Sequence, residues 1–202
     1  MRQHPLHRAA HAAALTLPRG ASVEHFNFEQ QGLEGWQPIT GRWTVEALHD
    51  APQSQRVLVQ RAVENPFNVI VAPSASCTDV DVSVQFKPIA GREDASGGIV
   101  FRLTAGCYYV LRANALENNF RLYYYDRGRH QLASASVPPP ALGQWHTIRV
   151  VAVGEHMQGY LNGALLLEHC DSRLRAGQIG LWTKADSITA FDNLVIRGVP
   201  GT

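Results

Sequence analysis

Aromatic and basic side chains share one side of several short segments that alternate between apolar and polar residues. In 98–125 and 178–184 the residues between the apolar ones project to the opposite face of each strand. Aromatic rings stack on the C–H surfaces of sugars, and guanidinium and amide groups bond sugar hydroxyls. These residue types predict a saccharide site formed by Arg102, Tyr108, Arg112, Asn114, Arg121, Tyr123, Trp182 and Lys184, with Asp186 at its rim. The alternative is a solvated sheet face on which long side chains cover their cross-strand neighbours.

Carboxyl groups that could cleave a sugar are scarce near this face. A glycosidase of the ordinary kind needs two of them, one on each side of the scissile bond. Only Glu117 and Asp186 fall near the rim. Ordinary glycoside hydrolysis is therefore not expected.

The elements that must position these residues are strands. Val80, Val82, Val84 and Phe86 alternate with polar residues, as in a strand with one buried face. Twelve further runs rich in Val, Ile, Tyr, Phe and Trp follow the same pattern: 42–48, 56–61, 68–71, 98–103, 108–113, 120–125, 131–137, 146–153, 157–161, 165–169, 178–183 and 189–196. No run has a helical period, which leaves a two-sheet sandwich or a closed barrel. The predicted core contains Phe101, Tyr109, Leu111, Phe120, Leu122, Leu181 and Phe191.

Two local signals fix connections between these strands. Asn162-Gly163, between two apolar runs, predicts a two-residue type I′ hairpin turn. The run Pro138-Pro139-Pro140 has no N–H groups to donate to a sheet and predicts a connection outside the strands.

Composition limits the classes of partner. The chain has 202 residues, and its 18 basic and 17 acidic residues leave a net charge of +1, so no broad basic surface for nucleic acid is expected. No apolar stretch is long enough to span a membrane. The cysteines, Cys77, Cys107 and Cys170, match no metal-binding spacing, and their disulfide state stays open.

The N-terminus has the layout of an export signal. Residues 1–8 are basic, 9–17 are mostly apolar, and small residues follow at 20–22. We therefore expect residues 1–24 to be a leader, removed on export or disordered, and the protein to be periplasmic or secreted. The sandwich is expected over 25–198, with a short tail over 199–202.

Five short segments together resemble a known group of proteins. They are Gly97-Gly98-Ile99-Val100-Phe101-Arg102, Gly143-Gln144-Trp145-His146 with Leu161-Asn162-Gly163, and Gly177-Gln178-Ile179-Gly180-Leu181-Trp182 with Phe191-Asp192-Asn193. In this order they resemble the concanavalin A-like lectin and glucanase superfamily, and within it a bacterial group related to the 3-keto-disaccharide hydrolases. The resemblance implies an all-β, two-sheet antiparallel jelly-roll sandwich, laminin-G-like, with a groove on its concave sheet.

The resemblance leaves three functions open. The first is a non-catalytic module that binds a saccharide or polysaccharide on the concave sheet. The second is an enzyme that cleaves 3-keto-glycosides, with Glu117 or Asp186 as base and Arg112 or Lys184 polarising the ketone. That family has an Asn-Ser-Gly-like motif where this chain has Ser96-Gly97-Gly98, which weakens the comparison. The third is a structural or protein-interaction domain.

The resemblance also implies a structural calcium ion. In concanavalin A-like modules such an ion often ties the first strand to the last through carbonyl groups and one or two carboxylates. Glu29 and Asp192 occupy the matching positions and are the expected metal ligands.

Overall fold

The computed structural model describes residues 12–29 and 32–201, and within these ranges it contains strands and no helix. Consequently no helix in this part of the chain could cross a membrane. The strands are β1 (Ser22–Phe26), β2 (Gln37–Thr40), β3 (Trp43–Ala47), β4 (Arg56–Gln60), β5 (Phe67–Val71), β6 (Cys77–Ala90), β7 (Ser96–Thr104), β8 (Cys107–Asn114), β9 (Asn119–Tyr125), β10 (Arg129–Ser136), β11 (His146–Val153), β12 (His156–Leu161), β13 (Ala164–Cys170), β14 (Gln178–Lys184) and β15 (Ile188–Pro200).

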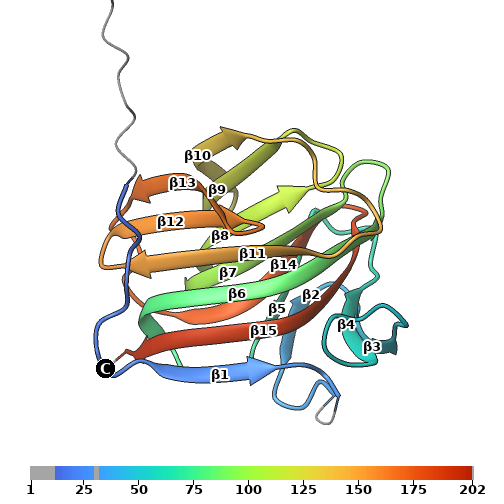
Figure 1. Cartoon of the computed structure of the whole chain (residues 1–202), viewed down its shortest axis with the longest axis horizontal. Coiled ribbons are helices and arrows are strands. Elements are labelled where there is room, and N and C mark those ends of the chain that lie inside the picture. The colour runs from blue at the N-terminus through green and yellow to red at the C-terminus, as the bar shows by residue number, and fades with distance from the viewer. Residues whose placement is uncertain (1–11, 30–31, 202) are drawn as a thin grey trace, which may run out of the picture.

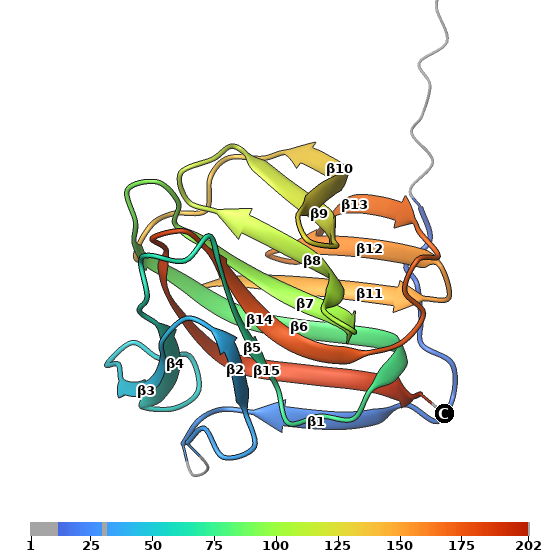
Figure 2. The ribbon, with the colours of Figure 1, turned by 180° about the vertical axis from the view of Figure 1, so that it is seen from behind.

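The strands form two antiparallel sheets that face each other. Sheet A has the order β13-β12-β11-β6-β15-β4-β3, with β1 paired to β15, and sheet B has the order β10-β9-β8-β7-β14-β5-β2. Figure 1 shows sheet A in front, and Figure 2, turned by 180°, shows sheet B in front. The predicted two-sheet sandwich is confirmed, and the closed barrel is not formed.

Alternation along the strands explains the core. Every second residue of β6, from Val80 to Phe86, is fully buried and packs against the inner face of sheet B. All seven predicted core residues are buried, with at most 3% of each exposed. Burying one such side chain contributes about 1.5–3 kcal/mol, so this layer supplies most of the driving force for folding.

Both predicted connections are present. Asn162 and Gly163 have φ angles of 49° and 84°, the left-handed values that a type I′ turn requires, and they join β12 to β13. The three prolines lie between β10 and β11, outside both strands. Cys77, Cys107 and Cys170 are all free thiols.

The sandwich begins earlier than predicted. Ser22–Phe26 is a strand that pairs with β15 along its whole length, so part of the expected leader belongs to sheet A. Sequence alternation missed β1 and β2 because both are short, and both are mostly exposed.

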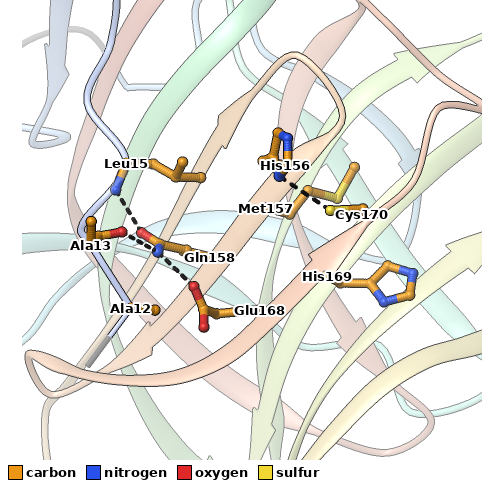
Figure 3. A pocket seen from close by; sticks show the side chains of 9 residues that line it. All are labelled: Ala12, Ala13, Leu15, His156, Met157, Gln158, Glu168, His169 and Cys170. Carbon is orange, nitrogen blue, oxygen red and sulfur yellow. Dashed lines mark hydrogen bonds between the residues drawn. The ribbon is translucent and has the colours of Figure 1, made fainter. Parts of the chain in front are cut away.

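The chain before β1 also contacts sheet A. The backbone N–H of Leu15 donates to Oε1 of Gln158 (2.8 Å), and Nε2 of Gln158 donates to the carbonyl of Ala13 (2.9 Å), as Figure 3 shows. Gln158 on β12 is 3% exposed and is also held by Glu168 of β13. A single buried amide thus holds two backbone groups of this segment. Residues 1–11 lie outside the described residues, and export remains a prediction.

Candidate functional site

The outer face of sheet B carries a second apolar cluster, separate from the core between the sheets. It consists of Val69, Val100, Tyr108, Val110, Tyr123 and Trp182, with Phe67, Leu103 and Tyr125 packed against it. The neighbours of these residues along each strand, such as Ile99, Leu111 and Leu181, point into the main core. An outer face this apolar argues against the alternative of a merely solvated surface.

This face is strongly curved. Phe67 on β5 and Tyr125 on β9 are separated by three strands, yet their ring centroids lie 5.8 Å apart in an edge-to-face contact. In a flat sheet with strands about 4.8 Å apart, four steps would separate these positions by about 19 Å. The guanidinium of Arg129, on β10, lies 5.2 Å from the centre of the Phe67 ring. Sheet B is therefore concave on its outer side.

Trp182 lies at the bottom of this concavity and is fully buried. It stacks on Phe67 at 5.6 Å between ring centroids. Alternation correctly placed Trp182 away from the main core, but the prediction of an accessible stacking platform was wrong. Phe67 covers its ring from above, so a ligand meets Phe67 and Tyr125 instead. Tyr108, 5% exposed and stacked on Tyr125, is likewise covered.

A hollow of about 330 Å³ opens beside the Phe67 and Tyr125 contact. Its walls are mostly apolar and include both rings, Tyr108 and Ile39, with Thr40 and Asn65 as polar groups. The contribution of β5 and its flanking loop was missed in the sequence analysis. Phe67 is the first residue of its strand, so no preceding strand residue establishes an alternation that would predict which face it occupies.

Polar groups gather around a buried carboxylate at the ends of β7, β8 and β14. Asp94 is 1% exposed; it accepts hydrogen bonds from Lys184 Nζ (2.6 Å) and Asn114 Nδ2 (2.6 Å). Two of the predicted site residues, Lys184 and Asn114, are thus brought together. Asp94 itself was not predicted. It lies in the loop before β7, and alternation predicts the orientation of side chains only within a strand.

Arg112 and Glu117 form a second ion pair on this face, 2.8 Å apart. Arg112 also donates to the backbone carbonyl of Asn119 and to the hydroxyl of Tyr123. Burial would raise the pKa of Glu117, but the charge of Arg112 and hydrogen bonds from Asn119 and Arg112 outweigh it and lower that pKa. Glu117 is therefore ionised at neutral pH and is the more accessible carboxylate of the two pairs, with 32% of its side chain exposed.

Two predicted site residues serve other purposes. Arg102 lies at φ 53° in an irregular stretch of β7, which turns its side chain between the sheets to bond the carbonyls of Thr78 and Leu174. The alternating pattern assigned Arg102 to the outer face because the pattern assumes a regular strand. The bulge interrupts the alternation of side chains at this point of β7. Asp186 accepts the backbone N–H groups of residues 92–94 and so holds the loop that carries Asp94.

The segment Ser96-Gly97-Gly98 packs closely at the centre of the sheet. A Cβ on Gly97 would lie 2.7 Å from the Phe86 ring, and one on Gly98 would lie 2.9 Å from the Leu111 carbonyl oxygen. The buried hydroxyl of Ser96 accepts the Lys184 N–H. The two glycines therefore allow neighbouring groups to pack closely against the strand, and Ser96 fixes the backbone at Lys184.

A comparison with protein-family models matches residues 23–197, nearly the whole described sandwich, to the 3-keto-alpha-glucoside-1,2-lyase-like domain family. The chain belongs to this family. The match confirms the family suggested by the sequence segments. No curated protein matches the sequence significantly.

Solved structures confirm the fold of this 3-keto-alpha-glucoside-1,2-lyase-like domain as concanavalin A-like. The carbohydrate-binding module CBM66 from Bacillus subtilis superposes with a TM-score of 0.68 at 20% identity, covering 81% of this chain and 96% of the module. Domain 4 of AbnA, a GH43 extracellular arabinanase from Geobacillus stearothermophilus solved with arabinotriose, gives 0.60 at 15% identity, covering 90% and 95%. The exoplasmic/lumenal domain of VIP36, in a Ca²⁺/Man3GlcNAc-bound form, gives 0.62 at 10% identity, covering 88% and 89%.

The expected calcium ligands of the lyase-like domain lie close together. Backbone N–H groups of one loop reach both: Gln53 donates to Asp192 and Gln55 to Glu29. Asp192 is fully buried, and burial raises its pKa. Among the described residues no group of three His, Cys, Asp or Glu side chains is placed to hold a metal. Two carboxylates suit a calcium ion that takes its other ligands from carbonyls and water, and the ion remains a prediction.

Proposed function

We propose that this lyase-like domain binds a saccharide on the concave face of sheet B and acts as a non-catalytic glycan-binding module. The observation that carries the proposal is the contact between Phe67 and Tyr125, which places two accessible rings beside a hollow on the concave face. Rings of this kind bind the C–H faces of sugars. Beside them, Lys184 offers a donor to hydroxyl groups and Glu117 an acceptor, with 25% and 32% of their side chains exposed. The predicted ligand contacts Arg112 and Asn114 are buried and hold these two groups in place through Glu117 and Asp94.

Two structural neighbours support the proposal. CBM66 is a carbohydrate-binding module, and the arabinanase domain was solved in complex with a trisaccharide. These ligands belong to other proteins, and they bear on this chain only because its concave face has the chemistry that sugar binding requires.

We also propose that the protein is exported, either to the periplasm or out of the cell. The layout of residues 1–22, basic and then apolar with small residues at the end, supports this proposal. Fractionation of the producing cell, with N-terminal sequencing of the mature chain, tests it. An intact N-terminus on a protein confined to the cytoplasm would refute it.

Calorimetric titration with a panel of oligosaccharides tests the binding proposal. Tyr125→Ala removes one accessible ring and should weaken binding by about 1–2 kcal/mol, roughly tenfold. Tyr160 supplies the matched control because it is a tyrosine of sheet A, under Arg149. Tyr160→Ala should leave affinity unchanged. Equal affinities for wild type and Tyr125→Ala would refute the assignment of the site to this face.

Cleavage of 3-keto-glycosides is the second candidate, favoured by the family match and by the ionised Glu117 beside Arg112. In that reaction a base removes the proton at C2, next to the C3 ketone. The electron pair forms the C1–C2 double bond, the C1–O bond breaks, and the leaving oxygen takes up a proton. Glu117 would be the base, and Arg112 or Lys184 would stabilise the negative charge that develops on the ketone oxygen.

One assay separates the two functions. The protein is incubated with a 3-keto-disaccharide and, as control, with the same disaccharide carrying a hydroxyl group at C3, and the released sugar is measured. Turnover of the keto form alone, with kcat lowered about 100-fold or more in Glu117→Gln, would establish the enzyme. Saturable binding without sugar release would establish the module.

A further inference from the structure

Three arginines converge on one phenol in the concave face of sheet B. Nη2 of Arg112 lies 3.4 Å and Nη1 of Arg121 3.3 Å from the hydroxyl of Tyr123. The guanidinium of Arg129 lies 4.6 Å from the centre of the same ring. The three come from neighbouring strands, β8, β9 and β10, so the backbone holds their positive charges close together.

The carboxylates of this face neutralise only part of this charge. Glu117 pairs with Arg112 and Asp94 pairs with Lys184. Within residues 12–29 and 32–201 no carboxylate lies in ion-pair distance of Arg121 or Arg129. The face therefore has a local excess of two positive charges, although the whole chain is nearly neutral.

Arg129 is the better defined of these two cations. Its guanidinium contacts the Phe67 and Tyr123 rings, and its Nη1 atom is buried without a hydrogen-bond partner among the described residues. A buried N–H donor of a charged group is costly to leave unpaired. Arginine presents such donors in a planar fork that matches the two oxygens of a carboxylate or sulfate group.

The surrounding groups show the effect of this charge. Burial alone would raise the pKa of Tyr123, but the hydrogen bond from Arg121 and the charges of Arg112 and Arg129 outweigh it and lower the pKa. An anion at this position would be attracted by the same three groups. A neutral sugar hydroxyl would leave two of the charges without a counter-ion.

We infer that the preferred ligand of the concave face is an acidic saccharide, whose carboxylate or sulfate group binds Arg129 and Arg121 while a sugar ring rests on Phe67 and Tyr125. The inference rests on the proposed binding of a saccharide to this face. It adds the chemical class of the ligand. Lys184, which is paired with Asp94 but has 25% of its side chain exposed, then serves the uncharged part of the ligand.

Matched pairs of ligands test the inference directly. Trisaccharides of galacturonate, glucuronate and mannuronate are each titrated beside their full methyl esters, which keep the sugar and remove the charge. A sulfated tetrasaccharide and its desulfated form distinguish sulfate from carboxylate. We expect at least one charged form to bind about tenfold or more tightly than its neutral counterpart, with a preference that falls as salt rises from about 50 to about 300 mM.

Arg129→Gln should abolish this preference while binding of the neutral form persists. Arg127→Gln is the control, because Arg127 lies in the adjacent turn with 97% of its side chain exposed, and it should change nothing. Melting curves verify that each variant is folded. If Arg129→Gln does not fold, two other measurements test the inference. They are the salt dependence of the charge preference in the wild type and the charge preference of Arg121→Gln.

The outcomes separate the inference from the proposed function. Equal binding of charged and neutral forms would overturn the acidic ligand and uphold saccharide binding. Binding of neither form, at millimolar concentrations across the panel, would overturn both. A charge preference unaffected by Arg129→Gln and Arg121→Gln would place the anion elsewhere and overturn the inference.

Discussion

Phe67 and Tyr125 touch across the concave face of sheet B, with ring centroids 5.8 Å apart, although they lie on strands four steps apart. The contact has two consequences. It buries Trp182 beneath Phe67, and it leaves two other rings where a ligand can reach them. The curvature of the sheet, more than the identity of any one residue, therefore decides which aromatic residues are available for binding.

Trp182→Ala should destabilise the fold by about 3–5 kcal/mol, because it removes a fully buried ring from the second apolar cluster. Chemical denaturation monitored by circular dichroism measures the loss. Trp182→Phe keeps most of the apolar volume and should cost clearly less. A change below about 1 kcal/mol in Trp182→Ala would show that the ring is accessible and that Phe67 does not cover it.

Lys184→Met should cost about 1–3 kcal/mol, because the carboxylate of Asp94 is 1% exposed and loses its charged partner. Asn114 still donates to Asp94, and Lys184 is a quarter exposed, which keeps the loss below that of a fully buried pair. The double variant Asp94→Asn/Lys184→Met should be more stable than Lys184→Met alone. Additive losses in this double-mutant cycle would mean that the two side chains do not interact.

Asp192→Asn should remove any effect of calcium on stability. Because burial raises the pKa of Asp192 in the folded state, the unfolded state is ionised first, and stability falls as pH rises through the carboxyl range. A bound calcium ion would counter this loss, so it should raise the melting temperature of the wild type at neutral pH and leave Asp192→Asn unchanged. Identical wild-type melting curves in calcium and in chelator would exclude the ion.

Gln158→Ala should release the N-terminal segment from sheet A. The variant loses the hydrogen bonds to Leu15 and Ala13, at a cost of about 1 kcal/mol. Limited proteolysis should then cut the segment before β1 faster, with the sandwich intact. Glu155→Ala, in the neighbouring turn, is the control and should leave the cleavage rate unchanged. Equal cleavage of wild type and Gln158→Ala would show that the amide does not hold the segment.

Sequence alternation determined the two faces of most strands. Phe101 and Leu111 lie in the main core and Tyr123 and Trp182 on the outer face, as the period of two predicts, because a regular strand points successive side chains to opposite sides. The Asn162-Gly163 turn was equally predictable, since few residue pairs tolerate two left-handed conformations in succession.

Only the tertiary structure decided which of the outer-face residues a ligand can reach. The bulge near Arg102 turned that side chain between the sheets, and the loop held by Asp186 brought Asp94 to Lys184. The curvature of sheet B brought Phe67 to Tyr125 and covered Trp182. The period of two describes one strand at a time, whereas bulges, loops and curvature depend on contacts between segments far apart in the chain.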